Sequence, residues 1–192
     1  MHASGDGRAG ATRTWVKLMW DDRFLYVGAL VETPDVQASR TTHDAALDQE
    51  DNFTLLLDPA GDGRELFAIL TNAHGAIRDV RLAKPPSQGG VEDLAWNCPA
   101  LDGGVRVQGT LNDASDQDRS WTVEMAIPWE CLGTSMPTPG DVWRANFLRN
   151  DLAEGTESDP ERAADTRAWA PSWNAHAMEP QHWGRIQFVR TQ

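Results

Sequence analysis

The stretch Trp121-Thr122-Val123-Glu124-Met125-Ala126-Ile127 decides the fold class of this chain. Its large apolar side chains alternate with Thr, Glu and Ala. This two-residue period is typical of a β-strand that has one face in a core and one face turned outward. No segment of the chain shows a convincing 3.6-residue period, so the sequence predicts strands rather than helices as the main elements.

Working outward from residues 121–127, turn and loop signals divide the chain into further short strands. Breaker-rich turns follow at 58–63 and 84–90, and long polar loops are expected at 33–51 and 151–167. Helical turns are expected near Ala45 and at 128–132. The remaining predicted strands are 14–19, 24–32, 52–57, 64–71, 76–82, 105–111, 141–150 and 182–189.

Strands at such spacing predict an all-β fold, a jelly-roll-like β-sandwich of two antiparallel sheets with long loops. The length of 192 residues fits one domain, which we assign to residues 13–192. Residues 1–12 are interpreted as a linker or an added end, since they are rich in Gly and Ala and lack the apolar centre of a signal peptide.

Charge excludes two classes of partner. The formal net charge is −12, with 29 acidic and 17 basic residues. This balance argues against binding nucleic acid, which needs clustered Lys and Arg, and against docking on an anionic membrane. The longest apolar run, at 24–31, is far shorter than the roughly 20 residues that a membrane-spanning helix needs.

No catalytic motif is found, so we predict that the chain is not an enzyme. It lacks a G-x-S-x-G elbow, a phosphate-binding loop and an H-E-x-x-H helix. The two cysteines, Cys98 and Cys131, are too few for a disulfide framework. We expect two free buried thiols; a disulfide in an exported protein is the alternative.

One acidic turn is a candidate cation site. Residues 112–118 place Asp113, Asp116 and Asp118 close together, and Ca²⁺ is a hard cation that takes carboxylate oxygens. A solvated hairpin tip is the alternative interpretation. None of the five histidines pairs at helical metal spacing, so no transition-metal site is expected from the sequence.

Tryptophan usage suggests a ligand platform. The chain has nine Trp and one Tyr, and Trp169 and Trp173 lie with His176 in a loop that contains Pro and Ser. Flat aromatic rings stack on the apolar faces of sugars, and nearby polar groups bond the hydroxyls. The alternative is that these rings cover a sheet edge. Trp183, in the last predicted strand, is expected in the core.

A series of motifs in a fixed order extends over residues 14–189, and with them the chain resembles the family 9 carbohydrate-binding modules. The motifs are VKLMWDD at 16–22, LYVGA at 25–29, DNF at 51–53 running into LDP at 57–59, Asn72, GTLND at 109–113, WTVE at 121–124 with AIPW at 126–129, GD at 140–141 with WRANF at 143–147, WAP at 169–171, His176, and EP at 179–180 with WG at 183–184.

The resemblance implies a sandwich, a structural calcium ion, an oligo- or polysaccharide ligand, and attachment to a secreted glycan-active enzyme. It therefore implies an extracellular or periplasmic location. Members that grip a chain end clamp it between two Trp. Here the first clamp segment, 45–50, has no aromatic residue, Thr54 replaces a Glu, and the second clamp falls near His176 and Ala177. The charged residue usual at 67–69 is also absent.

We therefore expect a non-catalytic module that binds carbohydrate through residues other than the family's clamp tryptophans. Trp173, Trp169 and Trp96 are predicted to stack on the sugar. Asn72, Arg149 and His176 are predicted to donate or accept hydrogen bonds.

Two alternatives remain open. The first is a structural domain that has lost its sugar and contacts a neighbouring domain of a parent chain. The second is a haem-binding sandwich with His176 and Met178 as axial ligands.

Overall fold

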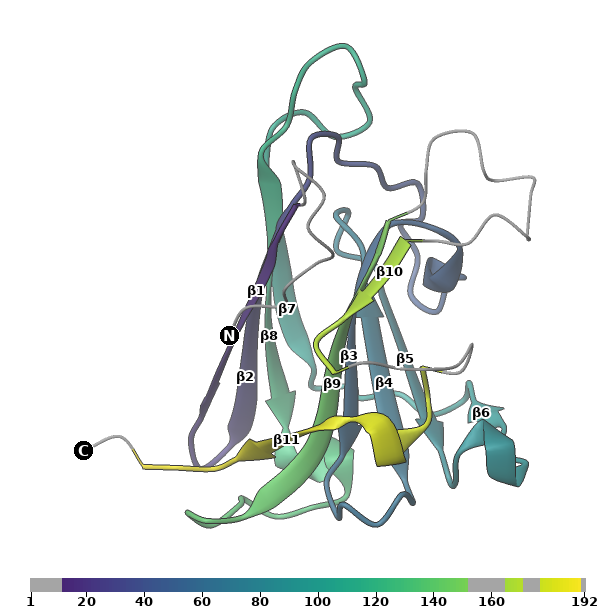
Figure 1. Ribbon diagram of the computed structural model, residues 1–192, viewed down its shortest axis with the longest axis vertical. Helices are drawn as coiled ribbons and strands as arrows, with labels where there is room; N and C mark the ends of the chain where they lie inside the picture. The colour runs from purple at the N-terminus through teal and green to yellow at the C-terminus, as the bar shows by residue number, and fades with distance from the viewer. Residues whose placement is uncertain (1–11, 152–164, 171–176, 191–192) are drawn as a thin grey trace.

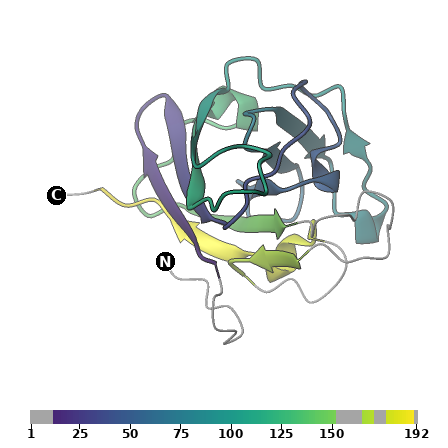
Figure 2. The ribbon, with the colours of Figure 1, turned by 90° about the horizontal axis from the view of Figure 1, so that it is seen from above.

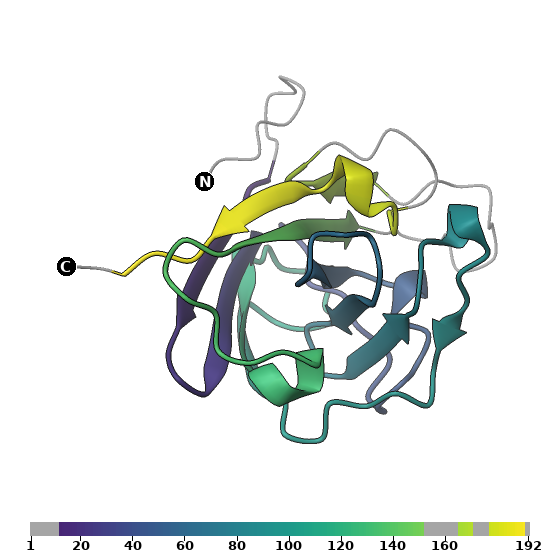
Figure 3. The same ribbon diagram turned by 90° about the horizontal axis from the view of Figure 1, so that it is seen from below.

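The protein is a sandwich of two antiparallel sheets (Figure 1). The computed structural model describes residues 12–151, 165–170 and 177–190. Views from above and below show both sheets curving around a shared interior (Figures 2 and 3). No helix among the described residues is long and apolar enough to cross a membrane.

The smaller sheet has the strand order β1-β2-β8-β7. Its longest ladder joins β2 to β8 and runs from the pair Phe24↔Pro128 to the pair Glu32↔Ser120. The bounds are β1 Thr14–Trp20, β2 Phe24–Glu32, β7 Asp102–Gln108 and β8 Ser120–Pro128.

The larger sheet has the order β10-β9-β3-β4-β5-β6, and β11 also pairs with β9. β10 pairs with the C-terminal part of β9 and β11 with its N-terminal part, so both lie along the same edge of that strand. The bounds are β3 Asn52–Asp58, β4 Leu66–Thr71, β5 Ile77–Leu82, β6 Glu92–Asp93, β9 Val142–Asp151, β10 Asp165–Ala168 and β11 Gly184–Gln187. Single 3₁₀ turns are η1 Leu47–Gln49, η2 Pro86–Gln88, η3 Trp129–Leu132 and η4 Pro180–His182.

The main core lies between the sheets and follows from the two-residue period. In β8, Trp121, Val123, Met125 and Ile127 are all at most 3% exposed, as the alternation predicts. Facing them across the sandwich are Phe53, Leu55, Leu57, Phe67, Ile69, Ala145 and Phe147 of the larger sheet.

A second apolar cluster covers the outer face of the larger sheet. It contains the alternate residues of β3, β4 and β5 together with Leu47 of η1 and Trp183 next to η4. β3 is consequently buried along its whole length on both faces. The expectation that Trp183 lies in a core is confirmed, because its ring is 6% exposed and Nε1 donates to the Ala177 carbonyl at 2.8 Å.

The predicted fold class is confirmed, most strand ends differ from the prediction by one or two residues, and larger differences occur in three places. β10 begins inside the segment predicted as a loop and ends just after it, and the two-residue β6 was not expected. β7 runs from Asp102 to Gln108 rather than over 105–111. Directly after it, Gly109 has φ +152° and passes so close to Asp118 that a Cβ would lie 1.7 Å from Asp118 Oδ1, so the backbone there has a conformation and a clearance that suit glycine.

Much of the tryptophan content is structural. Trp129 and Trp143 contact Phe188 edge to face, with ring centroids 6.1 and 4.9 Å apart, and Trp20 does so at 5.5 Å. Edge-to-face pairs at these distances add to the free energy gained by burying the rings. The cluster joins the C-terminal segment after β11 to the two sheets.

Cys98 and Cys131 form a disulfide, so the expectation of free thiols is wrong. Cys98 lies in the segment between β6 and β7 and Cys131 in η3, which follows β8. Their Cα atoms are 5.2 Å apart. Sequence separation alone could not show this, because the two segments meet only when the sheets pack.

Replacing both cysteines, as Cys98→Ser with Cys131→Ser, should lower the free energy of unfolding by about 2–4 kcal/mol. The bridge spans 33 residues, and losing it restores freedom to the unfolded chain. Urea unfolding with and without a reducing agent measures this. Reductant should weaken the parent protein and leave the double variant unchanged; equal stability of both under oxidising conditions would contradict the prediction.

Candidate functional site

A groove of about 500 Å³ lies on the outer face of the larger sheet. Strands β3, β4, β5 and β9 provide its base, and residues of η1, β6, β10 and the segment before η4 line its sides. Figure 1 shows η1 (blue) and η4 (yellow) placed toward opposite ends of this sheet.

The floor of the groove is apolar and its rim is polar. The floor residues point outward by the two-residue period of their strands and belong to the second apolar cluster. A binding site with an apolar floor and a few polar side chains suits a small organic ligand with apolar faces and hydroxyl edges. The floor consists of Leu56, Ala68, Leu70, Val80 and Leu148, and the polar lining of Asp48, Thr54, Arg78, Glu92, Asn150 and Thr166.

One side of the rim is a chain of polar side chains. Thr166 Oγ1 donates to Asn150 Oδ1 at 2.7 Å, and Asn150 Nδ2 donates to Asn52 Oδ1 at 3.0 Å. The Thr54 hydroxyl donates to the same Asn52 oxygen at 2.8 Å. Asn52 in turn donates to the Leu47 and Glu50 carbonyls, which ties η1 to β3. The rim is therefore held in place before any ligand arrives.

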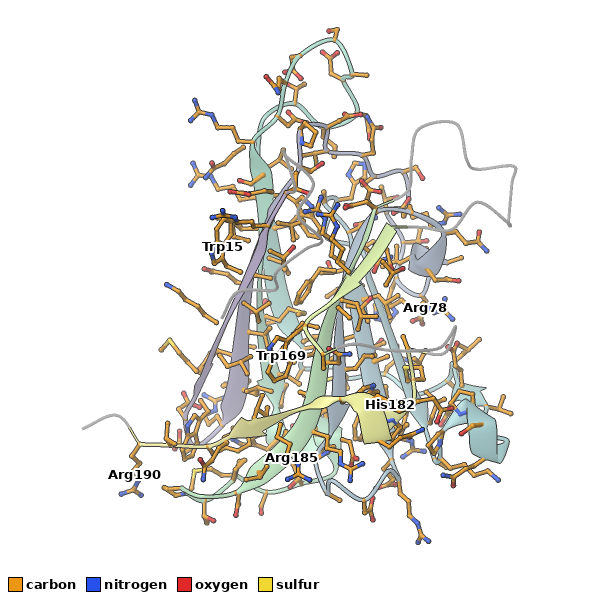
Figure 4. The ribbon with its side chains drawn as sticks, in the orientation of Figure 1. Trp15, Arg78, Trp169, His182, Arg185 and Arg190 are labelled. Atoms are coloured by element: carbon orange, nitrogen blue, oxygen red, sulfur yellow. A yellow bond between two sulfur atoms is a disulfide. The ribbon has the colours of Figure 1, made fainter. Side chains whose placement is uncertain are left out.

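Arg78 is the central charge of the other side. Its guanidinium donates to Asp48 Oδ1 at 2.5 Å and to Glu92 Oε2 at 2.6 Å. Figure 4 shows Arg78 projecting from β5 on this side of the molecule. The sequence analysis missed this residue; the available signal was a charged side chain on the same strand face as the buried Val80.

The groove includes several positions to which the resemblance assigns the clamp of family 9 modules. Asp48, Thr54 and Ala177 line it, and so does Ala68, in the stretch that lacks the usual charged residue. Arg78 on β5 pairs with Leu70 on β4, so it lies on the strand next to the one that carries Ala68. A positive charge is thus present in the groove, supplied by β5.

Trp169 and Trp96 lie elsewhere. Trp169 is half-buried, its ring 5.4 Å from Phe147, and it covers Gly184, where a Cβ would lie 2.4 Å from the indole. Figure 4 shows it well apart from Arg78. Trp96 is half-buried against Phe67, with centroids 5.2 Å apart. Neither ring lines the groove.

Asn72 and Arg149 are buried and engaged within the protein. Asn72 is fully buried; its amide donates to the Glu50 carboxylate and to the Arg40 carbonyl. Arg149 is 3% exposed, pairs with Asp151 at 2.6 Å and donates to the Glu32 carbonyl. These contacts hold loops to the sheet, and a sugar contact by either residue stays a prediction.

Trp173 and His176 lie outside the described residues, so their predicted roles stay predictions. Both precede Ala177, a groove residue, in the chain. Met178, the second predicted haem ligand, is half-buried at the groove.

The predicted calcium turn is organised by its own hydrogen bonds. Asp118 is buried and accepts from the Thr110 amide at 2.7 Å and the Val36 amide at 2.6 Å. Asp113 accepts from the Ser115 hydroxyl and amide, which lowers the pKa of its carboxyl. Asp116 is exposed. Among the described residues, the oxygens of Asp113, Asp116 and Asp118 do not all lie close enough together to hold one ion. Calcium at this turn stays a prediction.

Asn72→Ala should lower the free energy of unfolding by about 1–3 kcal/mol, because it leaves the buried Glu50 carboxylate short of a donor. Burial by itself raises the pKa of Glu50, but hydrogen bonds from Asn72, Ser39 and Arg40 together outweigh it and lower that pKa below 4.5. The ionised form is therefore favoured by folding. Its stabilisation is present above the ordinary pKa and is lost as pH falls through the folded-state pKa.

Urea unfolding of this variant should consequently show a larger loss at about pH 7 than at about pH 3. Asn97→Ala, at an exposed position, is the matched control and should change little. A loss for Asn72→Ala that is equal at both pH values would contradict the assigned role of Glu50.

Comparisons with known proteins agree with the sandwich fold. The family model described as "Carbohydrate family 9 binding domain-like" matches residues 2–191. Comparison with curated protein sequences gave no significant match.

Several solved structures share the fold. A family 9 carbohydrate-binding module from Caldicellulosiruptor kristjanssonii in complex with cellotriose has a TM-score of 0.65 at 19% identity, covering 97% of this chain and 80% of that one. The module in complex with glucose gives 0.64 at 20% identity, over 96% and 81%. A putative carbohydrate-binding protein from Bacteroides uniformis gives 0.64 at 14% identity, over 92% and 78%.

Proposed function

Because the chain belongs to the carbohydrate family 9 binding domain-like family, we propose that it is a non-catalytic module that binds an oligo- or polysaccharide in the groove of the larger sheet. The observation that carries the proposal is an apolar floor beside a preorganised polar rim, which includes several positions to which the resemblance assigns the family's sugar clamp. Two similar solved structures, one with cellotriose and one with glucose, support the ligand class.

The groove has the size and chemistry for one or a few sugar units. Its volume of about 500 Å³ is within the usual range for small-molecule sites. A pyranose presents C–H groups on its faces, which suit the floor of Leu and Val side chains. Its hydroxyls suit carboxylates, which accept, and a guanidinium, which only donates.

Arg78, Asp48 and Glu92 form the polar anchor in this proposal. In the free protein the guanidinium binds the two carboxylates, whose side chains are 56% and 43% exposed. The Arg78 side chain is only 15% exposed, whereas both carboxylates are open to solvent, so sugar hydroxyls can reach the carboxylates and share the guanidinium. Charge-assisted hydrogen bonds to a sugar then contribute more than bonds between neutral groups.

Stacking by Trp173 is the second part of the proposal. None of the groove residues that the structure describes carries an aromatic ring. Trp173 is four residues before Ala177, which lines the groove, and is therefore the tryptophan we assign to the sugar face.

We also propose that the module works outside the cytoplasm as part of a longer glycan-active protein. The Cys98–Cys131 disulfide supports an oxidising compartment, since such bonds are rare where thiols are kept reduced. Linked to a catalytic domain, a binding module raises the local concentration of that domain at its polysaccharide.

Arg78→Ala should weaken binding of cellotriose, or of the best hit on a glycan array, by about tenfold or more, since it removes a charged donor from the groove. Isothermal titration calorimetry measures the change. Arg106→Ala, on an exposed strand position outside the groove, is the matched control. If both variants weakened binding equally, the sugar site would not be in the groove.

Trp173→Ala should likewise weaken the same ligand by about tenfold or more, because a stacked ring buries apolar surface against the sugar. Trp15→Ala, on β1 in the other sheet, is the control. Thermal unfolding of each variant establishes that the fold is kept. If a broad glycan array shows no binding to the parent protein, the chain is instead a structural or interaction domain.

A further inference from the structure

His43, Asp44 and Asp79 converge at a point that the sugar proposal does not use. His43 and Asp44 lie in the long connection between β2 and η1, and Asp79 lies on β5. The Asp44 amide donates to the Ile77 carbonyl at 2.9 Å, which holds the connection against the start of β5. One ligand atom from each of the three side chains lies within 4.8 Å of the others.

Asp79 supplies the decisive observation, because half of its buried carboxylate has no donor. Oδ2 accepts from the Cys98 amide at 2.7 Å. Oδ1 is buried and receives no hydrogen bond from any described residue. A buried carboxylate oxygen without a donor is costly, and unsatisfied groups of this kind point to an unseen ion or water.

The imidazole of His43 stands next to this oxygen without satisfying it. Nε2 lies 3.2 Å from Asp79 Oδ1, but the geometry is not that of a hydrogen bond. The other ring nitrogen, Nδ1, lies 3.0 Å from Asp44 Oδ2. Two ligands of a tetrahedral zinc ion, each about 2.0–2.1 Å from the metal, are about 3.3 Å apart. The Nε2–Oδ1 separation therefore fits two ligands of one ion.

We propose that His43, through Nε2, and Asp79, through Oδ1, bind a divalent transition-metal ion, with Zn²⁺ as the expected occupant and a carboxylate oxygen of the neighbouring Asp44 as the third ligand. An imidazole together with two carboxylates is a donor set that suits zinc, whereas calcium prefers six to eight oxygens. Three protein ligands leave a fourth position for water. The His43 side chain is 51% exposed and that of Asp79 1%, so an ion can enter from solvent and neutralise the buried charge.

The site would tie the β2–η1 connection to β5. Asp48 of η1 belongs to the same connection and lies in the groove beside Arg78 of β5. On β5, Arg78 faces the groove and Asp79 faces the space between the sheets, where its ladder partner Ile69 packs in the main core. The ion is thus separate from the proposed sugar site.

The test is calorimetric titration of chelator-treated protein with ZnCl₂, with CaCl₂ in a parallel titration. One zinc ion per chain should bind, with an affinity at least tenfold above that for calcium. Thermal unfolding should shift to higher temperature with zinc, because an ion that binds only the folded state stabilises it. His43→Ala and Asp79→Asn should each weaken zinc binding by tenfold or more.

Asp79→Asn keeps the side-chain shape and an acceptor for the Cys98 amide, and His43→Ala alters an exposed position, so one variant can serve if the other fails to fold. His74→Ala, at an exposed position in the turn between β4 and β5, is the matched control and should bind zinc like the parent protein. Unchanged binding to His43→Ala, a preference for calcium, or no zinc binding would each overturn the proposal. The last result would leave His43 as an ion-pair partner of two carboxylates.

Discussion

Burial of β3 on both faces is the constraint on which the rest of the structure depends. Phe53, Leu55 and Leu57 pack into the core between the sheets, while Leu56 packs into the outer cluster under the groove. Neighbouring strands β4 and β9 extend both layers. The groove floor is therefore the outer face of the same sheet whose inner face forms the sandwich core.

Buried carboxylates anchor the long loops of this fold by accepting hydrogen bonds from backbone amides. Asp118 accepts hydrogen bonds from two backbone amides in separate loops. The Glu50 carboxylate accepts hydrogen bonds from Ser39, Arg40 and Asn72. Each oxygen of these groups has a donor, so long connections are held without regular structure of their own. Asp79 departs from this pattern, since only one of its oxygens is satisfied. That departure is the physical reason to regard it as a ligand rather than as another loop anchor.

Most of the fold could be predicted because strand periodicity is a local property. The predicted strand at 24–32 agrees with β2 to the residue, and β8 extends its prediction by one residue at each end. β10 could not be predicted in the same way. It has four residues, Asp165–Ala168, in a polar stretch, and it forms only because the free edge of β9 offers partners. Both ends of β7 lie before the predicted ones, and the ladder with β8, which the pattern along one strand does not show, defines where β7 pairs.

Sequence alone determined the fold class, the family, the acidic net charge and the general expectation of a sugar ligand. These depend on alternation, on motif order and on charge, which are all readable along the chain. Only the tertiary structure decided which polar residues share a site. Asn72 and Arg149 have the chemistry to bind a sugar but are used internally, whereas Arg78 and Asn150 come from strands far apart in sequence and line one groove. The Cys98–Cys131 bond and the His43–Asp79 contact could likewise not be predicted from the sequence. Such contacts depend on how strands and loops pack in space and not on the spacing of residues along the chain.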